Sequence, residues 1–121
     1  MPVDIDGNVL FVRQYRHPAG QILLELPAGT LEPEESPDDC AAREIREEVG
    51  MSAKRITKIG EFFMVPGYST EYMHAYLATE LTPDPLQGDD DEFIEVEKIP
   101  LKRAYAMVRD GKINDAKTIT L

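Results

Sequence analysis

Three glutamates, Glu44, Glu47 and Glu48, lie close together directly after Arg43. On a helix, where successive residues are about 100° apart, their side chains share one arc of the surface. Glu44 and Glu48 are four residues apart and repel each other, and Arg43 offsets only part of this repulsion. Clustered carboxylates are the ligands that Mg²⁺ or Mn²⁺ prefers, and such a cation would turn the repulsion into binding. The alternative is a solvated, charged helix face, and the helix by itself leaves both interpretations open.

A helix that begins after Ser36 and ends at Gly50 is expected to position these glutamates. Ser36 is a favourable N-cap, Pro37 fits the first helical turn, and glycine is typical of the residue that follows a helix. Apolar side chains occupy a different arc of this helix and are Ala41, Ala42, Ile45 and Val49. This arc should pack on a sheet and leave the glutamates on another face.

The other elements predicted from the sequence are strands and a late helix. Strands are expected at 3–15 with a turn at 6–8, at 22–26, at 54–65, at 70–80 and at 93–99, and a helix at 101–110. The run 9–12 is apolar on both faces, as a central strand would be. Strands around one middle helix and one late helix predict an α/β fold of the α+β kind, with helices packed on a mixed β-sheet.

The composition limits the classes of partner. The chain has 121 residues and a formal net charge of −10, which predicts one domain spanning 1–121. The acidic excess argues against a nucleic-acid partner and against an anionic membrane surface, because both require a basic face. The single cysteine, Cys40, and an N-terminus without a signal-peptide pattern favour a cytoplasmic location.

A longer pattern surrounds the acidic helix. Gly29 is followed after five residues by Glu35, and after seven more by the run Arg43-Glu44-Ile45-Arg46-Glu47-Glu48-Val49-Gly50-Met51. This pattern resembles the signature of the Nudix hydrolases at each of its fixed positions, and residues 29–51 are called the Nudix box below. The resemblance implies the Nudix fold, an α/β/α sandwich with a mixed β-sheet. It also implies hydrolysis of a nucleoside diphosphate linked to another group, with Mg²⁺ or Mn²⁺ as cofactor.

The resemblance further implies roles for single residues. The metal ligands would be the backbone carbonyl of Ala28 and the carboxylates of Glu44, Glu47, Glu48 and Glu92. Gly29, Glu35, Arg43 and Gly50 would hold the box in shape. Catalysis would involve Glu47, Glu48, Glu92 and Asp90, where Asp90 stands at the position at which close relatives often carry the glutamate that deprotonates water. Three residues therefore remain candidates for the general base: Asp90 acting through an added water, Glu92 and Glu47.

Residues outside the box point to a subgroup. Pro66 lies fifteen residues beyond Met51, inside Val65-Pro66-Gly67-Tyr68-Ser69-Thr70-Glu71, and this spacing resembles the ADP-ribose pyrophosphatases. The resemblance implies a substrate site formed by Arg16, Thr30, Pro66 and Glu71, with Arg16 on phosphate. Members of this subgroup usually form homodimers through an N-terminal β-rich segment. We expect no such separate N-terminal dimerisation domain in this chain, although a homodimer remains possible.

The leading hypothesis is therefore Mg²⁺-dependent hydrolysis of ADP-ribose to AMP and ribose 5-phosphate. A second hypothesis keeps the chemistry but changes the small-molecule nucleotide substrate to another nucleotide sugar, a dinucleotide polyphosphate or an oxidised nucleotide. A third is a non-catalytic Nudix module that senses a nucleotide. Loss of box glutamates would favour this third hypothesis, and all of them are present.

Overall fold

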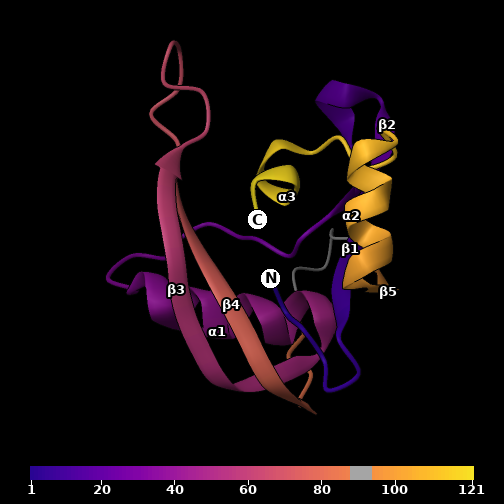
Figure 1. The fold of residues 1–121 in the computed structure, drawn as a ribbon. Coiled ribbons are helices and arrows are strands. Elements are labelled where there is room, and N and C mark those ends of the chain that lie inside the picture. Colours follow the sequence, from indigo (N-terminus) through magenta and orange to yellow (C-terminus); the bar gives the residue numbers. More distant parts are fainter. Residues whose placement is uncertain (88–93) are drawn as a thin grey trace.

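A computed structural model describes residues 1–87 and 94–121 and places two sheets beside three helices (Figure 1). The strands are β1 (Asn8–Arg16), β2 (Gln21–Glu25), β3 (Met51–Phe63), β4 (Tyr72–Pro83) and β5 (Glu95–Pro100). The helices are α1 (Pro37–Val49), α2 (Leu101–Arg109) and α3 (Ala116–Thr120), and a 3-10 turn covers His17–Ala19. Apart from the segment before the turn at 6–8, the observed bounds of the described strands lie within about three residues of those predicted, as expected for sequence-based boundaries.

Strand β1 is the centre of a three-stranded sheet with the order β2-β1-β5, and both of its pairings are antiparallel. Its apolar residues point alternately to two cores. Val9 and Phe11 belong to a cluster that includes Ala104 of α2, whereas Leu10 and Val12 pack with Ile45 of α1. A strand that is apolar on both faces is thus covered on both faces, which produces the layered α/β/α arrangement that the sequence predicts.

Strands β3 and β4 form a long antiparallel hairpin with an irregularity between Lys58 and Gly60. A parallel bridge between Pro2 and Ala78 joins the hairpin to the N-terminal segment, and an antiparallel bridge joins Val3 to Val9. The predicted strand before the turn at 6–8 is therefore reduced to these isolated bridges. The Asp4 carboxylate accepts the amide N–H groups of Asp6 and Asn8, so residues 4–8 form a turn.

Helix α1 begins and ends as the sequence predicts. The Ser36 hydroxyl oxygen accepts the amide N–H of Asp39 at 3.2 Å, which satisfies one of the free donors of the first turn. Gly50 ends the helix with φ of 69°, a left-handed conformation that glycine adopts without steric cost. This helix packs on β3 and β1 and carries the Nudix box.

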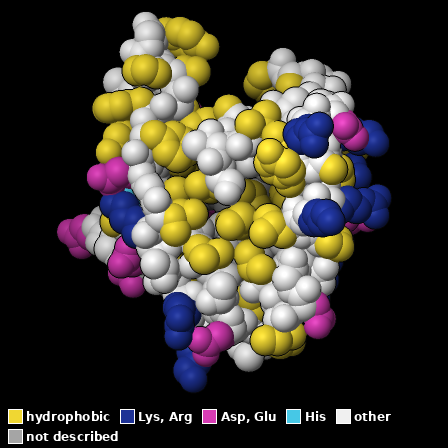
Figure 2. Space-filling view, in the orientation of Figure 1, with side chains coloured by type: hydrophobic (Ala, Val, Ile, Leu, Met, Phe, Trp, Pro, Cys, Tyr) yellow, Lys and Arg dark blue, Asp and Glu magenta, His cyan; other side chains and the backbone are white. Residues whose placement is uncertain are grey.

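Helix α2 matches the predicted helix at 101–110, but α3 was not predicted from the sequence. It has only five residues, too few for a helical period to be recognised. The Asp115 carboxylate caps it by accepting the amide N–H of Thr118 at 3.0 Å. Both chain ends lie between the β3–β4 hairpin and the three-stranded sheet, and hydrophobic side chains gather in the hollow between them (Figures 1 and 2).

Within the two described ranges, none of the helices combines the length and apolarity needed to cross a membrane.

Candidate active site

The loop between β2 and α1 lies against the acidic face of the helix. The Ala28 amide N–H donates a hydrogen bond of 3.0 Å to Oε2 of Glu48. Only 7% of Glu48 is exposed, so this bond satisfies part of a nearly buried carboxylate. The fold thus brings the main chain of Ala28 to a helix residue twenty positions later.

Gly29 lies directly against Glu44. A Cβ atom at Gly29 would overlap the Glu44 carboxylate group, so the close approach of loop and helix depends on the missing side chain. Glu44 is itself mostly buried, with 13% of its side chain exposed. Through Ala28 and Gly29, the loop therefore contacts two carboxylates on one face of α1.

Arg43 forms hydrogen bonds with three acids of the box at once. Its Nε and Nη2 donate to the two oxygens of Glu35 at 2.8 and 2.9 Å. Its Nη1 donates to Glu44 and to Glu47, both at 2.7 Å. The Arg43 guanidinium lowers the pKa of Glu35 to about 2, and these carboxylates raise the pKa of Arg43 in turn. The like charges that oppose one another on α1 are thus partly compensated by a bidentate arginine.

The donor set suits a hard divalent cation. Glu44, Glu47 and Glu48 offer carboxylate oxygens from one helix face, and the Ala28 main chain lies beside Glu48. Among the described residues, no three acidic, histidine or cysteine side chains already converge as a complete ligand group. Glu44 and Glu47 point instead to Arg43. The residue types and their common face fit Mg²⁺ or Mn²⁺, while ligation would draw these two side chains away from the arginine.

Arg16, a predicted phosphate ligand, is held by Glu25, which is not among the predicted site residues. Its Nε and Nη2 each donate to Glu25 at 2.8 Å. Burial would raise the pKa of Glu25, but hydrogen bonds from Arg16 and Lys117 outweigh burial and lower it. Glu25 is the one charged residue in the apolar run at 22–26, and a charge within a buried strand was the signal that could have identified it.

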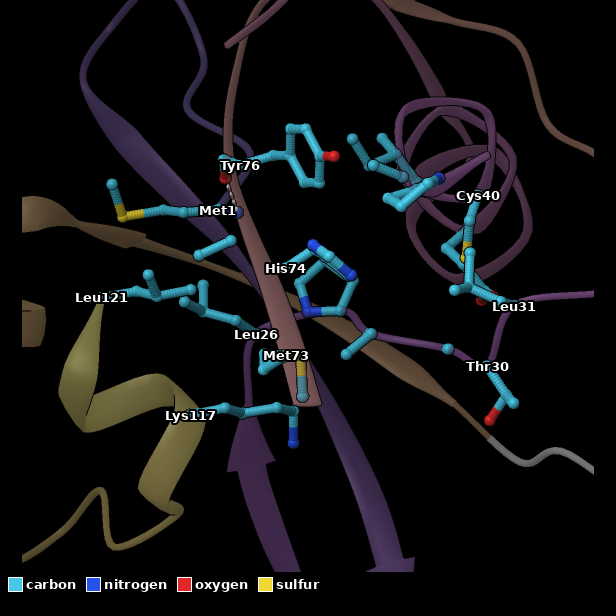
Figure 3. Close-up of a pocket in the computed structure, with 18 of the residues that line it drawn as sticks. Met1, Leu26, Thr30, Leu31, Cys40, Met73, His74, Tyr76, Lys117 and Leu121 are labelled. Atoms are coloured by element: carbon cyan, nitrogen blue, oxygen red, sulfur yellow. Dashed lines mark hydrogen bonds between the residues drawn. The ribbon is translucent and has the colours of Figure 1, made fainter. Parts of the chain in front are cut away.

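Thr30 and Glu71 line a cavity of about 290 Å³ beside the box, together with Ala28, Gly29 and Glu44. Figure 3 shows Thr30 at one side of this cavity and Lys117 reaching toward it from α3. Pro66 does not line the cavity. It lies in the exposed turn between β3 and β4, and Glu71 lies at the end of the same turn.

Two further groups at the cavity have structural roles. The Tyr76 hydroxyl donates to Asp38 at 2.5 Å and so connects β4 to the first turn of α1. Burial raises the pKa of the Cys40 thiol to about 11, which leaves it protonated and unreactive at neutral pH. Cys40 is buried and forms no disulfide.

The two remaining predicted catalytic residues, Asp90 and Glu92, lie outside the described residues. Their predicted roles at the metal and at the attacking water stay predictions.

The loop, the capped helix and its face of glutamates define a Nudix domain. The model of the NUDIX domain family matches residues 2–121, and the chain belongs to this family.

Its relatives include enzymes for two nucleotide sugars. The chain is 39% identical to an ADP-ribose pyrophosphatase of Bacillus subtilis over 98% of its own length and 65% of that protein. It is 40% identical to a GDP-mannose pyrophosphatase of Yersinia enterocolitica, over 96% of this chain and 65% of that protein. The fold is similar to a crystal structure of an ADP compounds hydrolase, with a TM-score of 0.88, 30% identity, and coverage of 99% of this chain and 65% of that one. The chain thus spans about two thirds of the length of these relatives.

Proposed function

We propose that this chain is a Nudix pyrophosphohydrolase that splits ADP-ribose, with water and Mg²⁺, into AMP and ribose 5-phosphate. The observation that carries this proposal is the contact of Ala28 and Gly29 with Glu48 and Glu44. That contact places a loop main chain and two carboxylates at one point, beside a cavity large enough for part of a nucleotide sugar.

Each box residue has a defined task in this proposal. Glu44, Glu48 and the Ala28 carbonyl would hold Mg²⁺, and Glu47 would be a further ligand or orient the attacking water. Bound Mg²⁺ would neutralise the pyrophosphate charge and lower the pKa of a bound water. Before a metal binds, Nη1 of Arg43 holds the carboxylates of Glu44 and Glu47 together. Arg43 would remain paired with Glu35 afterwards. Asp90, Glu92 and Glu47 remain the candidates for the general base.

The substrate side of the proposal rests on Arg16 and on the relatives. Arg16 is 39% exposed, so part of its guanidinium faces solvent while Glu25 holds the other part. A planar guanidinium is suited to the oxygens of a diphosphate. The B. subtilis relative is an ADP-ribose pyrophosphatase, and the spacing of Pro66 fits the same subgroup. We assign Thr30, Pro66 and Glu71 to the remainder of the substrate.

Substitution of Glu48 by Gln tests the metal site. Activity with ADP-ribose and Mg²⁺ should fall by roughly a hundredfold or more, because the amide is a poor ligand for a hard cation. Glu97→Gln is a control that removes an exposed carboxylate of the opposite sheet edge. An undiminished rate for Glu48→Gln would refute the metal assignment.

GDP-mannose is the second candidate substrate, because a GDP-mannose pyrophosphatase is similar to the chain at 40% identity. A panel of ADP-ribose, GDP-mannose, dinucleotide polyphosphates and oxidised nucleotides, assayed by kcat/KM, separates these possibilities. A specific hydrolase should prefer one leaving group by orders of magnitude. Binding of a nucleotide without turnover of any panel member would favour the non-catalytic sensor instead.

Two properties beyond the reaction also belong to this proposal. We place the protein in the cytoplasm on the basis of its single cysteine, and we infer a possible homodimer from the subgroup resemblance. Light scattering of the purified chain measures the second property directly.

A further inference from the structure

Glu25 is the most deeply buried charged residue described in the chain, with 1% of its surface exposed. It lies at the end of β2, three residues before Ala28. A buried carboxylate is costly unless it is fully paired. Its partners are therefore informative about why it is there.

The two partners of Glu25 come from different parts of the fold. Arg16, at the end of β1, donates from Nε and Nη2 at 2.8 Å each, so Glu25 occupies one whole edge of the guanidinium. Lys117 of α3 donates to Glu25 from Nζ and also pairs with Asp115 at 3.2 Å. Two cations and two anions give this cluster no net charge.

The partners differ in their access to solvent. Lys117 has 11% of its side chain exposed, whereas Arg16 has 39% exposed. Lys117 thus serves to dock α3, as does Thr118, whose hydroxyl oxygen accepts the Leu26 amide N–H at 2.8 Å. The hydrogen bonds to Glu25 use Nε and Nη2 of Arg16 and leave Nη1 for another partner. Arg16 is also close enough to Glu48 of the box for their charges to interact.

We propose that Glu25 is a positioning residue for Arg16. Its buried carboxylate holds one edge of the guanidinium so that the opposite edge faces a diphosphate bound beside the Nudix box. A bidentate pair restricts both the place and the plane of the guanidinium, which a single hydrogen bond would not do. The inference rests on the proposed function only in that a diphosphate must bind at this side of the box.

Equilibrium binding of inorganic pyrophosphate, measured by calorimetry, tests the inference without assuming a nucleotide. Glu25→Gln should weaken binding roughly tenfold or more, as loss of an outer partner does at other positioned ligands. Arg16→Gln should weaken binding as well. The double variant should bind no more weakly than Arg16→Gln alone, because Glu25 acts through Arg16.

Thr118→Val is the matched control on helix α3. It removes the hydroxyl that accepts the Leu26 amide N–H and so loosens this helix. It leaves the pair of Arg16 and Glu25 intact, so pyrophosphate affinity should stay within about twofold of wild type. Thermal unfolding of every variant shows whether it is folded. Equal losses for Thr118→Val and Glu25→Gln would mean that the cluster is merely structural, and this outcome would overturn the inference.

Steady-state kinetics with ADP-ribose separates this inference from the proposed activity. If ADP-ribose is the substrate, Glu25→Gln should raise KM more than it lowers kcat. If ADP-ribose is not hydrolysed but pyrophosphate binding depends on Glu25 and Arg16 as expected, the proposed substrate is wrong. The positioning role of Glu25 is then still supported. Additive losses in the double variant, or no pyrophosphate binding by the wild type, would refute the role of Glu25.

Discussion

Arg43 contacts three glutamates with one guanidinium, and its pairing with Glu35 uses two parallel hydrogen bonds. This geometry explains how a helix can carry Glu44, Glu47 and Glu48 on one face without a metal. The repulsion between these carboxylates is partly offset by the guanidinium of Arg43, which lies beside them on the same helix. Arg43 thus compensates part of the negative charge that the box gathers on this helix face.

The pair of Glu35 and Arg43 predicts a dependence of stability on pH. Arg43 lowers the pKa of Glu35 from an ordinary value of 4.5 to about 2. A carboxylate whose pKa is lowered on folding stabilises the folded state at pH values above its pKa in the unfolded state. This contribution is lost as the pH falls from 4.5 toward 2. Thermal unfolding of wild type and Glu35→Gln should therefore differ at pH 7, and the difference should shrink over that range. A difference that stays constant to pH 2 would contradict the assignment.

Gly29→Ala should separate activity from stability. The new methyl group would overlap the Glu44 carboxylate, which lies at the end of a flexible side chain and can move away at little cost to folding. The melting temperature should change little, whereas displacement of a metal ligand should lower kcat/KM by about a hundredfold.

Gly60→Ala is the matched control for this experiment, because a Cβ atom at Gly60 would meet no atom within 4 Å. Full activity of Gly29→Ala would show that the position of Glu44 is unimportant.

At the scale of elements, α1 must begin at a fixed residue for its glutamates to face the loop. Ser36 defines that start in two ways, since its hydroxyl oxygen accepts the Asp39 amide N–H and its hydroxyl donates to the Asp39 carboxylate at 2.6 Å. The other end is fixed by the left-handed conformation of Gly50. Helix α1 is thus held at both ends by local hydrogen bonds.

Ser36→Ala should destabilise the protein by about 1 kcal/mol, the usual cost of losing an N-cap oxygen. For a domain of this size, that cost lowers the melting temperature by roughly 2–6 °C. Ser36→Thr is the control, because threonine keeps a hydroxyl that both accepts the Asp39 amide N–H and donates to the Asp39 carboxylate, and it should keep the melting temperature near that of wild type. Equal losses for the two variants would rule out the cap as the cause.

At the scale of the whole molecule, the net charge of −10 is concentrated in part on the box. If Mg²⁺ binds the folded protein there, it stabilises that state by mass action, by about 1.4 kcal/mol at ten times its dissociation constant. The melting temperature should therefore rise between EDTA and millimolar Mg²⁺. The double variant Glu44→Gln and Glu48→Gln should show little of this rise. A rise of the same size in that variant would assign it to unspecific screening of the acidic surface.

The β3–β4 hairpin shows where prediction from sequence was accurate only in outline. Its two strands were recognised from β-rich runs and from the Pro66-Gly67 break between them. Their extension to Met51 and Pro83 was not recognised, because those two residues pair with each other only once the hairpin has formed. The turn that holds Pro66 lies at the opposite end of the hairpin from the pair of Met51 and Pro83.

The helix of the Nudix box and its acidic face can be predicted from local sequence. Ser36, Gly50 and the spacing of the glutamates act within a few residues of one another, so capping and helical periodicity are sufficient to predict helix α1 and its acidic face. The family resemblance of this segment then indicated which of the two interpretations of that face to prefer.

The groups that surround the box depend on tertiary packing and cannot be predicted from local sequence. Glu25 meets Lys117 across 92 positions of the chain, and Ala28 meets Glu48 across 20. No local rule relates residues so far apart, because their contact depends on how β1, β2, α1 and α3 pack. Burial then decides the partners, since a carboxylate removed from water must find cations and N–H groups wherever the fold provides them.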